Sequence, residues 1–224
     1  MNIMEMIEQI NMLLHISLPV AMTSKTLQGY QLMLALLTIL IIGWRISVHK
    51  RRMIEQRERA FQKTLMEELG KTPSEYHVIN YVRIRTDKGV LTADHLVFSR
   101  YGIFVIMEEM NDGKITGTDV QDEWMACTKH YATAFDNPFN RLLTKRILLS
   151  RLTDAGTKCI IPIAVFNDDA ELKTKSSFPI VNCKNLANTI MSYKDEILSE
   201  RLLQKIESKL NVRQEMNNDK QEEL

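Results

Sequence analysis

The chain has 224 residues, of which 25% are charged and 45% are apolar, as in an ordinary folded protein. Its formal net charge is only +1. Tight, non-specific binding to duplex DNA is therefore excluded for the surface as a whole, because such binding comes from neutralising many phosphates. The three cysteines lie far apart and form no CxxC or Cys/His cluster, so neither a zinc site nor a disulfide framework is expected.

Residues 1–26 form an N-terminal segment that contains regularly spaced apolar residues. The spacing over residues 3–16 predicts an amphipathic helix, and Pro19 would end it. Such a helix could lie in a membrane interface or pack on a partner. A loosely ordered terminus is the alternative, and the pattern does not separate the two.

Residues 27–48 predict one transmembrane helix. Residues 32–44 carry no charge, and Tyr30 and Trp44 stand near the two ends, where aromatic belts lie. A helix over this range would be about 33 Å long, close to the roughly 30 Å thickness of the hydrocarbon core. A buried core helix is the alternative, because the uncharged run is short.

A cluster of cations follows this segment and predicts its orientation. Positive charge near the end of a membrane helix favours the cytoplasmic side. We therefore expect residues 1–26 outside and residues 49–224 in the cytoplasm of a bacterium, with a single pass through the inner (cytoplasmic) membrane. The cations are Arg45, Lys50, Arg51 and Arg52.

Residues 53–211 predict a cytoplasmic domain of mixed α/β type. A helix over residues 53–69 ends at Gly70, and three strands follow at residues 76–85, 90–99 and 103–107. Short turns join these strands, which predicts an antiparallel meander. The third strand is fully apolar and is therefore expected in the centre of the sheet.

The second half of this domain alternates helices and strands. A short strand is predicted over 112–117, and a long helix over 135–154 has Pro138 in its first turn. Two more strands and two amphipathic helices follow, at residues 158–166, 178–183, 184–193 and 199–210. The polar tail, residues 212–224, is predicted to be disordered.

Carboxylates gather where two of the predicted strands come together. Asp94 lies on one strand, and Glu108 and Glu109 directly follow the next. Neighbouring antiparallel strands can bring such groups onto one sheet face. Carboxylates placed there can hold Mg²⁺ and orient a water against a phosphodiester. The simpler interpretation is that Asp94 is a solvated or hydrogen-bonded strand residue.

Residues 90–124, followed by residues 137–152, resemble the nuclease-related domain family, called NERD, of the restriction-endonuclease-like PD-(D/E)XK class. The matching features are Asp94-His95 before "YGIFVI", the "GKITG" turn, Trp124, and Asn137-Pro138 at the start of a helix. The resemblance covers roughly residues 53–166. It implies a mixed-sheet restriction-endonuclease-like core with flanking helices and a divalent-metal-dependent DNA phosphodiesterase. Members are often attached to membrane segments, which agrees with residues 27–48.

The resemblance also implies roles for particular residues. Asp94 matches the family's metal ligand, and Glu58 falls on its first-helix glutamate. The family's Glu-x-Lys falls on Met107 and Glu109, and its glutamine falls on Arg141. A thioether does not bind Mg²⁺ usefully, and Glu109 reverses the charge of the lysine, so the motif is degenerate.

Two arrangements could restore a site. Glu109 could be the second metal ligand, with Arg141 supplying the lost cation. Alternatively, a β-bulge could turn Glu108 onto the active face. Lys145 and Arg146 lie near Arg141 on the predicted helix, where they could contact phosphate or simply form a solvated face.

The leading interpretation is a membrane-anchored nuclease-related domain that acts on or near nucleic acid and is catalytically impaired. If it is active, Glu58, Asp94 and Glu109 would bind Mg²⁺ or Mn²⁺, and Arg141 would hold the phosphate. The alternative is a non-enzymatic, membrane-tethered interaction or scaffold module of a larger assembly. The slightly acidic charge after residue 53 and the missing Glu-x-Lys favour this alternative.

Overall fold

A computed structural model describes residues 24–86 and 89–210 and divides the chain into two compact units, Met1–Gln56 and Arg57–Leu224. The helix predicted over residues 3–16 and the tail predicted over 212–224 lie outside the described residues. The same holds for residues 87 and 88 of the predicted hairpin turn.

The first described element is the helix α2, Ser24–Leu69. It joins the two helices predicted over residues 27–48 and 53–69 into one. It ends where Gly70 donates its backbone N–H to the carbonyl of Met66 at 2.9 Å. Among the helices of the described chain, none combines the length and the apolar character that a membrane span needs. The structure therefore does not support the predicted transmembrane helix at residues 27–48.

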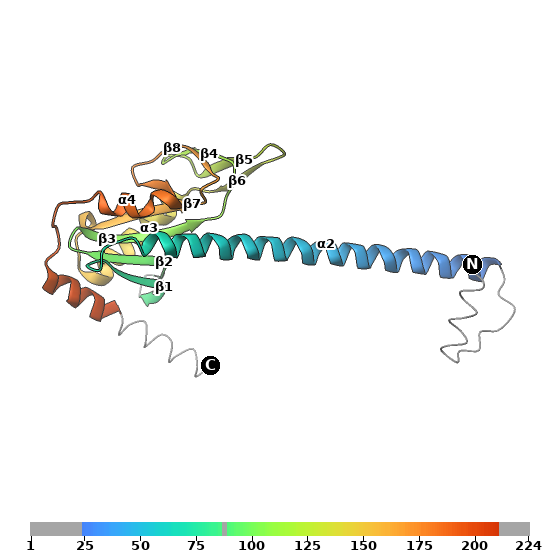
Figure 1. Ribbon diagram of the computed structural model, residues 1–224, viewed down its shortest axis with the longest axis horizontal. Coiled ribbons are helices and arrows are strands. Elements are labelled where there is room, and N and C mark those ends of the chain that lie inside the picture. Colours follow the sequence, from blue (N-terminus) through green and yellow to red (C-terminus); the bar gives the residue numbers. More distant parts are fainter. Residues whose placement is uncertain (1–23, 87–88, 211–224) are drawn as a thin grey trace. The chain divides into compact units, whose positions relative to one another are not determined.

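The larger sheet of the second unit has the strand order β1-β2-β3-β7-β9. Its first three strands pair antiparallel and lie side by side, which confirms the predicted meander (Figure 1). β3 then pairs parallel with β7, and β7 pairs parallel with β9. The strands are β1 (His77–Thr86), β2 (Gly89–Ser99), β3 (Gly102–Glu109), β7 (Ile160–Phe166) and β9 (Ile180–Asn182).

A smaller sheet has the order β6-β5-β4-β8, in which β4 pairs antiparallel with β5 and parallel with β8. Only β4 is predicted from the sequence. The other three strands are five residues long and carry little apolar signal, because β5 and β8 expose every second residue or nearly so, and β6 exposes four of its five residues. The strands are β4 (Lys114–Thr118), β5 (Glu123–Cys127), β6 (Ala132–Asp136) and β8 (Glu171–Lys175).

Helices cover both faces of the larger sheet, which makes the second unit a layered, mixed α/β fold. The helix α3 (Pro138–Thr153) and the helical residues 200–210 share one apolar cluster with inward side chains of the sheet. The end of α2 and the short helix α4 (Leu186–Met191) share another cluster on the opposite face. Two short 3₁₀ turns, Thr157–Cys159 and Cys183–Asn185, lead into β7 and α4.

Trp124 anchors the smaller sheet. It is fully buried in a third apolar cluster that also contains Met107 and Leu142. Its indole lies directly over Gly117, where an added Cβ would come within 2.3 Å of the ring. The indole N–H donates to the carbonyl of Thr118 at 3.0 Å. Because Met107 belongs to this cluster, the larger sheet and the smaller sheet share one core.

Candidate functional site

The candidate site lies where β2 and β3 separate. Their pairing ends at His95↔Ile106, whereas β3 continues beside β7 as far as Glu109↔Phe166. Asp94 is the next residue of β2, and its Oδ2 accepts the backbone N–H of Glu108 at 2.9 Å. The Asp94 carboxylate therefore replaces the backbone acceptor that the N–H of Glu108 would have in a continuous β2–β3 ladder.

The ladder between β1 and β2 is also interrupted at this point. The pairs Asn80↔His95 and Val82↔Ala93 flank Tyr81 and Asp94, which are not paired. Tyr81 has a φ of 53°, an uncommon conformation for a residue other than glycine. Leu91, Ala93, Leu96 and Phe98 all belong to one apolar cluster, so the inward face of β2 shifts by one residue between 93 and 96. Strict alternation of side chains therefore fails at Asp94 and His95.

Glu109 ends β3 as a buried acid that is only 4% exposed. Its Oε1 accepts a hydrogen bond from Nη1 of Arg141 at 2.7 Å. Burial raises the pKa of Glu109 to about 7, and the nearby charges of Asp94 and Asp136 raise it further, while Arg141 opposes the shift. The desolvation of the carboxylate therefore outweighs its ion pair.

Lys145 stands one helical turn beyond Arg141 and completes the charged group. Its Nζ donates to the backbone carbonyl of Thr92 and to the Thr92 hydroxyl, the latter at 3.1 Å. Burial lowers the pKa of Lys145, although Asp94 and Glu109 act in the opposite direction. From the sequence, Lys145 could either contact phosphate or lie on a solvated face. Its i,i+4 spacing from Arg141 is the feature that places the two cations on the same side of the helix.

A groove of about 450 Å³ runs beside these cations, between α3 and β2. It combines the two cationic side chains with hydroxyl and amide groups, which are donors suited to phosphate. The residues that line it are Val90, Thr92, Asn140, Arg141, Thr144, Lys145 and Leu148.

Asn137 fixes the position of α3 and hence of both cations. Its Oδ1 caps the helix by accepting the N–H of Phe139 at 2.9 Å. Its Nδ2 donates to the carbonyls of Thr118 at 3.2 Å and Gln121 at 2.6 Å, in the turn after β4. The residue is 1% exposed. The Asn-Pro feature of the sequence is therefore a brace between α3 and the smaller sheet.

Glu108 has a different partner from Glu109. Its Oε1 lies 2.9 Å from Nε2 of the buried His95, whose Nδ1 lies 2.7 Å from Oδ1 of Asn80. β3 keeps a one-to-one register with β7 through Glu108 and Glu109. The bulge that would turn Glu108 onto the Asp94 side is therefore absent, and the contacts of His95 give it a structural role.

The other predicted residues divide into two groups. Asp94, Glu109 and Arg141 are brought together, whereas Glu58 is exposed on α2. Arg146 is not part of the charged group, because its Nε donates to the carbonyl of Thr157 at 2.8 Å.

The described residues do not fit a preformed metal site. Within residues 24–86 and 89–210, no three Asp, Glu, His or Cys side chains are grouped so that they could hold a metal ion. Asp94 and Glu109 supply hard oxygen atoms of the type that Mg²⁺ binds. However, Arg141 already neutralises Glu109, and Asp94 already accepts the N–H of Glu108.

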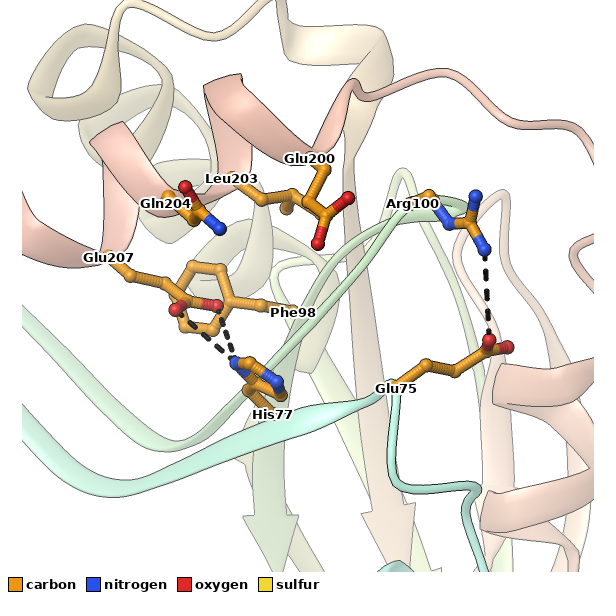
Figure 2. Close-up of a pocket in the computed structure, with 8 residues that line it drawn as sticks. All are labelled: Glu75, His77, Phe98, Arg100, Glu200, Leu203, Gln204 and Glu207. Atoms are coloured by element: carbon orange, nitrogen blue, oxygen red, sulfur yellow. Dashed lines mark hydrogen bonds and ion pairs between the residues drawn. The ribbon is translucent and has the colours of Figure 1, made fainter.

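A separate cavity of about 210 Å³ lies between the start of β1 and the helical residues 200–210 (Figure 2). His77 forms an ion pair with Glu207 at 3.2 Å, and Arg100 forms one with Glu75 at 3.9 Å. The contact of His77 with Glu207 joins the helical residues 200–210 to β1, whereas the contact of Arg100 with Glu75 joins the turn after β2 to the loop before β1. The cavity contains none of the predicted site residues.

Comparison with known proteins identifies the family. The model of the nuclease-related domain matches residues 55–167, about half of the chain. An uncharacterized protein of Bacillus anthracis is 26% identical over 151 residues, which make up 66% of this chain and 68% of that protein. No solved structure matches the chain. The matched residues contain the separated strands, the Asn137 brace and the charged group, and the chain belongs to the nuclease-related domain family.

Proposed function

We propose that the second unit associates with nucleic acid through the groove beside Arg141 and Lys145, and that its catalytic chemistry is impaired. The observation that carries this proposal is the ion pair between Glu109 and Arg141. It occupies the end of β3, where the family resemblance expects a lysine. Arg141 on α3 thus supplies a cation near this position, but it is paired with the carboxylate of Glu109, which a metal ion would need as a ligand.

Competition for Glu109 supports the impairment. A divalent metal bound by Asp94 and Glu109 would have to displace the Arg141 guanidinium from a 2.7 Å contact. With a pKa of about 7, Glu109 is also partly protonated at neutral pH, which weakens it as a ligand. Glu58 is the third metal ligand predicted from the sequence. It is exposed on α2, and no contact joins it to Asp94 or Glu109 among the described residues.

The cations support binding. The Arg141 side chain is 47% exposed although it contacts the buried Glu109, so part of its donor fork faces solvent. A guanidinium can hold phosphate through its remaining N–H groups while one of them keeps an internal contact. Asn140 and Thr144 line the same groove and add polar contacts.

The test is a cleavage and binding assay on the full chain. Plasmid and single-stranded DNA are incubated with Mg²⁺ or with Mn²⁺, and binding is measured in parallel at low salt without metal. We expect binding without efficient cutting. Metal-dependent cutting that Asp94→Ala abolishes would contradict the impairment. Absence of binding to either DNA would contradict the association with nucleic acid.

A second function, an interaction module, is favoured by the apolar surface of the first unit. Large apolar side chains on α2 are between 48% and 69% exposed from Tyr30 to Ile46, among them Leu34, Leu40 and Trp44. Contiguous apolar surface of this kind marks an attachment site. The location predicted from the sequence, at the inner membrane with residues 49–224 in the cytoplasm, stays a prediction. Fractionation of cells that express the full chain tests it, and recovery in the membrane-free fraction would contradict it.

A further inference from the structure

The outward face of β1 carries an alternating row of exposed residues. Val82 and Ile84 are buried in the apolar cluster under α3, so their neighbours point to the other side of the sheet. Those neighbours are Tyr81, Arg83 and Arg85, and all three are exposed. Tyr81 is 60% exposed, so most of its ring is open to a ligand.

The neighbouring strand leaves this row uncovered. Arg83 pairs with Thr92, and Arg85 pairs with Val90, and both partners are exposed on β2. Val90 is 44% exposed. These five residues, Tyr81, Arg83, Arg85, Val90 and Thr92, are called the β1 strip. The strip adjoins Asp94, which stands opposite Tyr81 at the interrupted ladder position.

Tyr81 is held in place by its surroundings. Its φ of 53° is sterically costly for a side chain with a Cβ, and such conformations persist where the structure enforces them, often at binding sites. Its ring lies 5.8 Å from the ring of His95, at 52° to it. His95 is fixed by Asn80 and Glu108. The exposed ring therefore loses little freedom when it binds a ligand.

The chemistry of the β1 strip is that of a platform for single strands. A planar aromatic ring stacks on any nucleobase, and arginines beside it neutralise phosphates. Arg83 and Arg85 are separated by two residues, about 7 Å along the strand, so they can follow an extended backbone. In a duplex the bases are already stacked and cannot reach Tyr81.

We propose that the β1 strip binds single-stranded nucleic acid, with a base stacked on Tyr81 and phosphates held by Arg83 and Arg85. This inference rests on the proposed association with nucleic acid and names the form that is bound. A single-stranded nucleic acid bound to the strip would lie next to Asp94. A local patch of this kind agrees with the near-zero charge of the whole chain.

The test measures binding of a fluorescently labelled oligodeoxythymidine to the full chain by anisotropy, without divalent metal. Tyr81→Asn removes the ring but keeps a residue that tolerates positive φ. We expect it to weaken binding by about tenfold, whereas Tyr81→Phe keeps the ring and should bind like the wild type. Arg83→Gln combined with Arg85→Gln should reduce the salt dependence of log affinity by about 1.4, because two phosphate contacts are lost.

Arg151→Gln is the matched control, because Arg151 is an exposed arginine in the last turn of α3 that belongs neither to the β1 strip nor to the lining of the groove, and it should leave affinity unchanged. Wild-type binding that Tyr81→Asn does not weaken would overturn the inference while leaving the proposed function intact. Equal competition by an unlabelled duplex would overturn the preference for single strands. A wild-type chain that binds no nucleic acid would overturn the proposed function itself.

Discussion

The buried carboxylate of Glu109 accepts a hydrogen bond from the guanidinium of Arg141 at 2.7 Å and thereby joins the end of β3 to the first half of α3. The contact is asymmetric, because the Glu109 side chain is 5% exposed and that of Arg141 is 47% exposed. Glu109 therefore loses more of its hydration than Arg141 does, and this burial raises the pKa of Glu109 to about 7. The pair therefore changes its charge state near neutral pH.

Glu109→Gln should remove a pH-dependent loss of stability. The pKa of Glu109 rises from 4.5 to about 7 on folding. Between these values the native chain holds a proton that the unfolded chain has released, so the free energy of unfolding falls as pH rises. The loss is complete above the folded pKa and amounts to about 3 kcal/mol. The variant should match the wild type near pH 5 and exceed its stability near pH 8, as measured by urea unfolding.

An equal difference between the two proteins at both pH values would show that Glu109 does not titrate in this window. Asp112→Asn is a suitable control, because Asp112 is a carboxylate that pairs with Arg57 and has a more exposed side chain than Glu109.

Arg141→Gln should destabilise the fold, since it leaves Glu109 buried without its cation. A fully buried pair would lose about 3–5 kcal/mol. Because Arg141 is half-exposed, we expect a smaller loss of about 1–2 kcal/mol. The double variant with Glu109→Gln should recover most of this loss, and a double-mutant cycle on unfolding free energies measures the coupling. Strictly additive effects would contradict a direct interaction.

His95→Ala should cost far more than His77→Ala, although each histidine contacts a glutamate. His95 is 1% exposed and lies within hydrogen-bonding distance of Asn80 and Glu108. Its removal leaves two polar groups without a partner, at a cost of about 2–3 kcal/mol. The exposed pair of His77 and Glu207 should contribute about 0.5 kcal/mol or less. Thermal unfolding of the two variants compares them, and equal losses would refute the argument.

Asn137→Ala should destabilise the unit by about 2–3 kcal/mol, because it removes a helix cap and leaves the turn carbonyls without their donor. Asn137→Asp keeps the oxygen that accepts the N–H of Phe139 but loses the Nδ2 donor to Thr118 and Gln121. The aspartate variant therefore separates the two roles. If Asn137→Asp is as stable as the wild type, the hydrogen bonds donated by Nδ2 contribute nothing to stability. Chemical denaturation gives both values.

The sequence by itself determined the elements whose signal is local. The spacing of apolar residues in α3, the Asn137-Pro138 start and the apolar run of β3 are visible because helix and strand periodicity depend on near neighbours in the chain. The antiparallel meander follows from short turns for the same reason. The family features around Asp94 and Trp124 also lie within one continuous stretch.

Only the tertiary structure decided what the polar residues contact. Arg141 and Lys145 lie beside Glu109, whereas Glu108 contacts His95. β8 pairs with β4 although more than fifty residues separate them in the chain. The one-residue shift at Asp94 likewise depends on Tyr81 of the neighbouring strand. The physical reason is that charge pairs and strand partners are selected by packing between distant segments, whereas periodicity records only which side of each segment is buried.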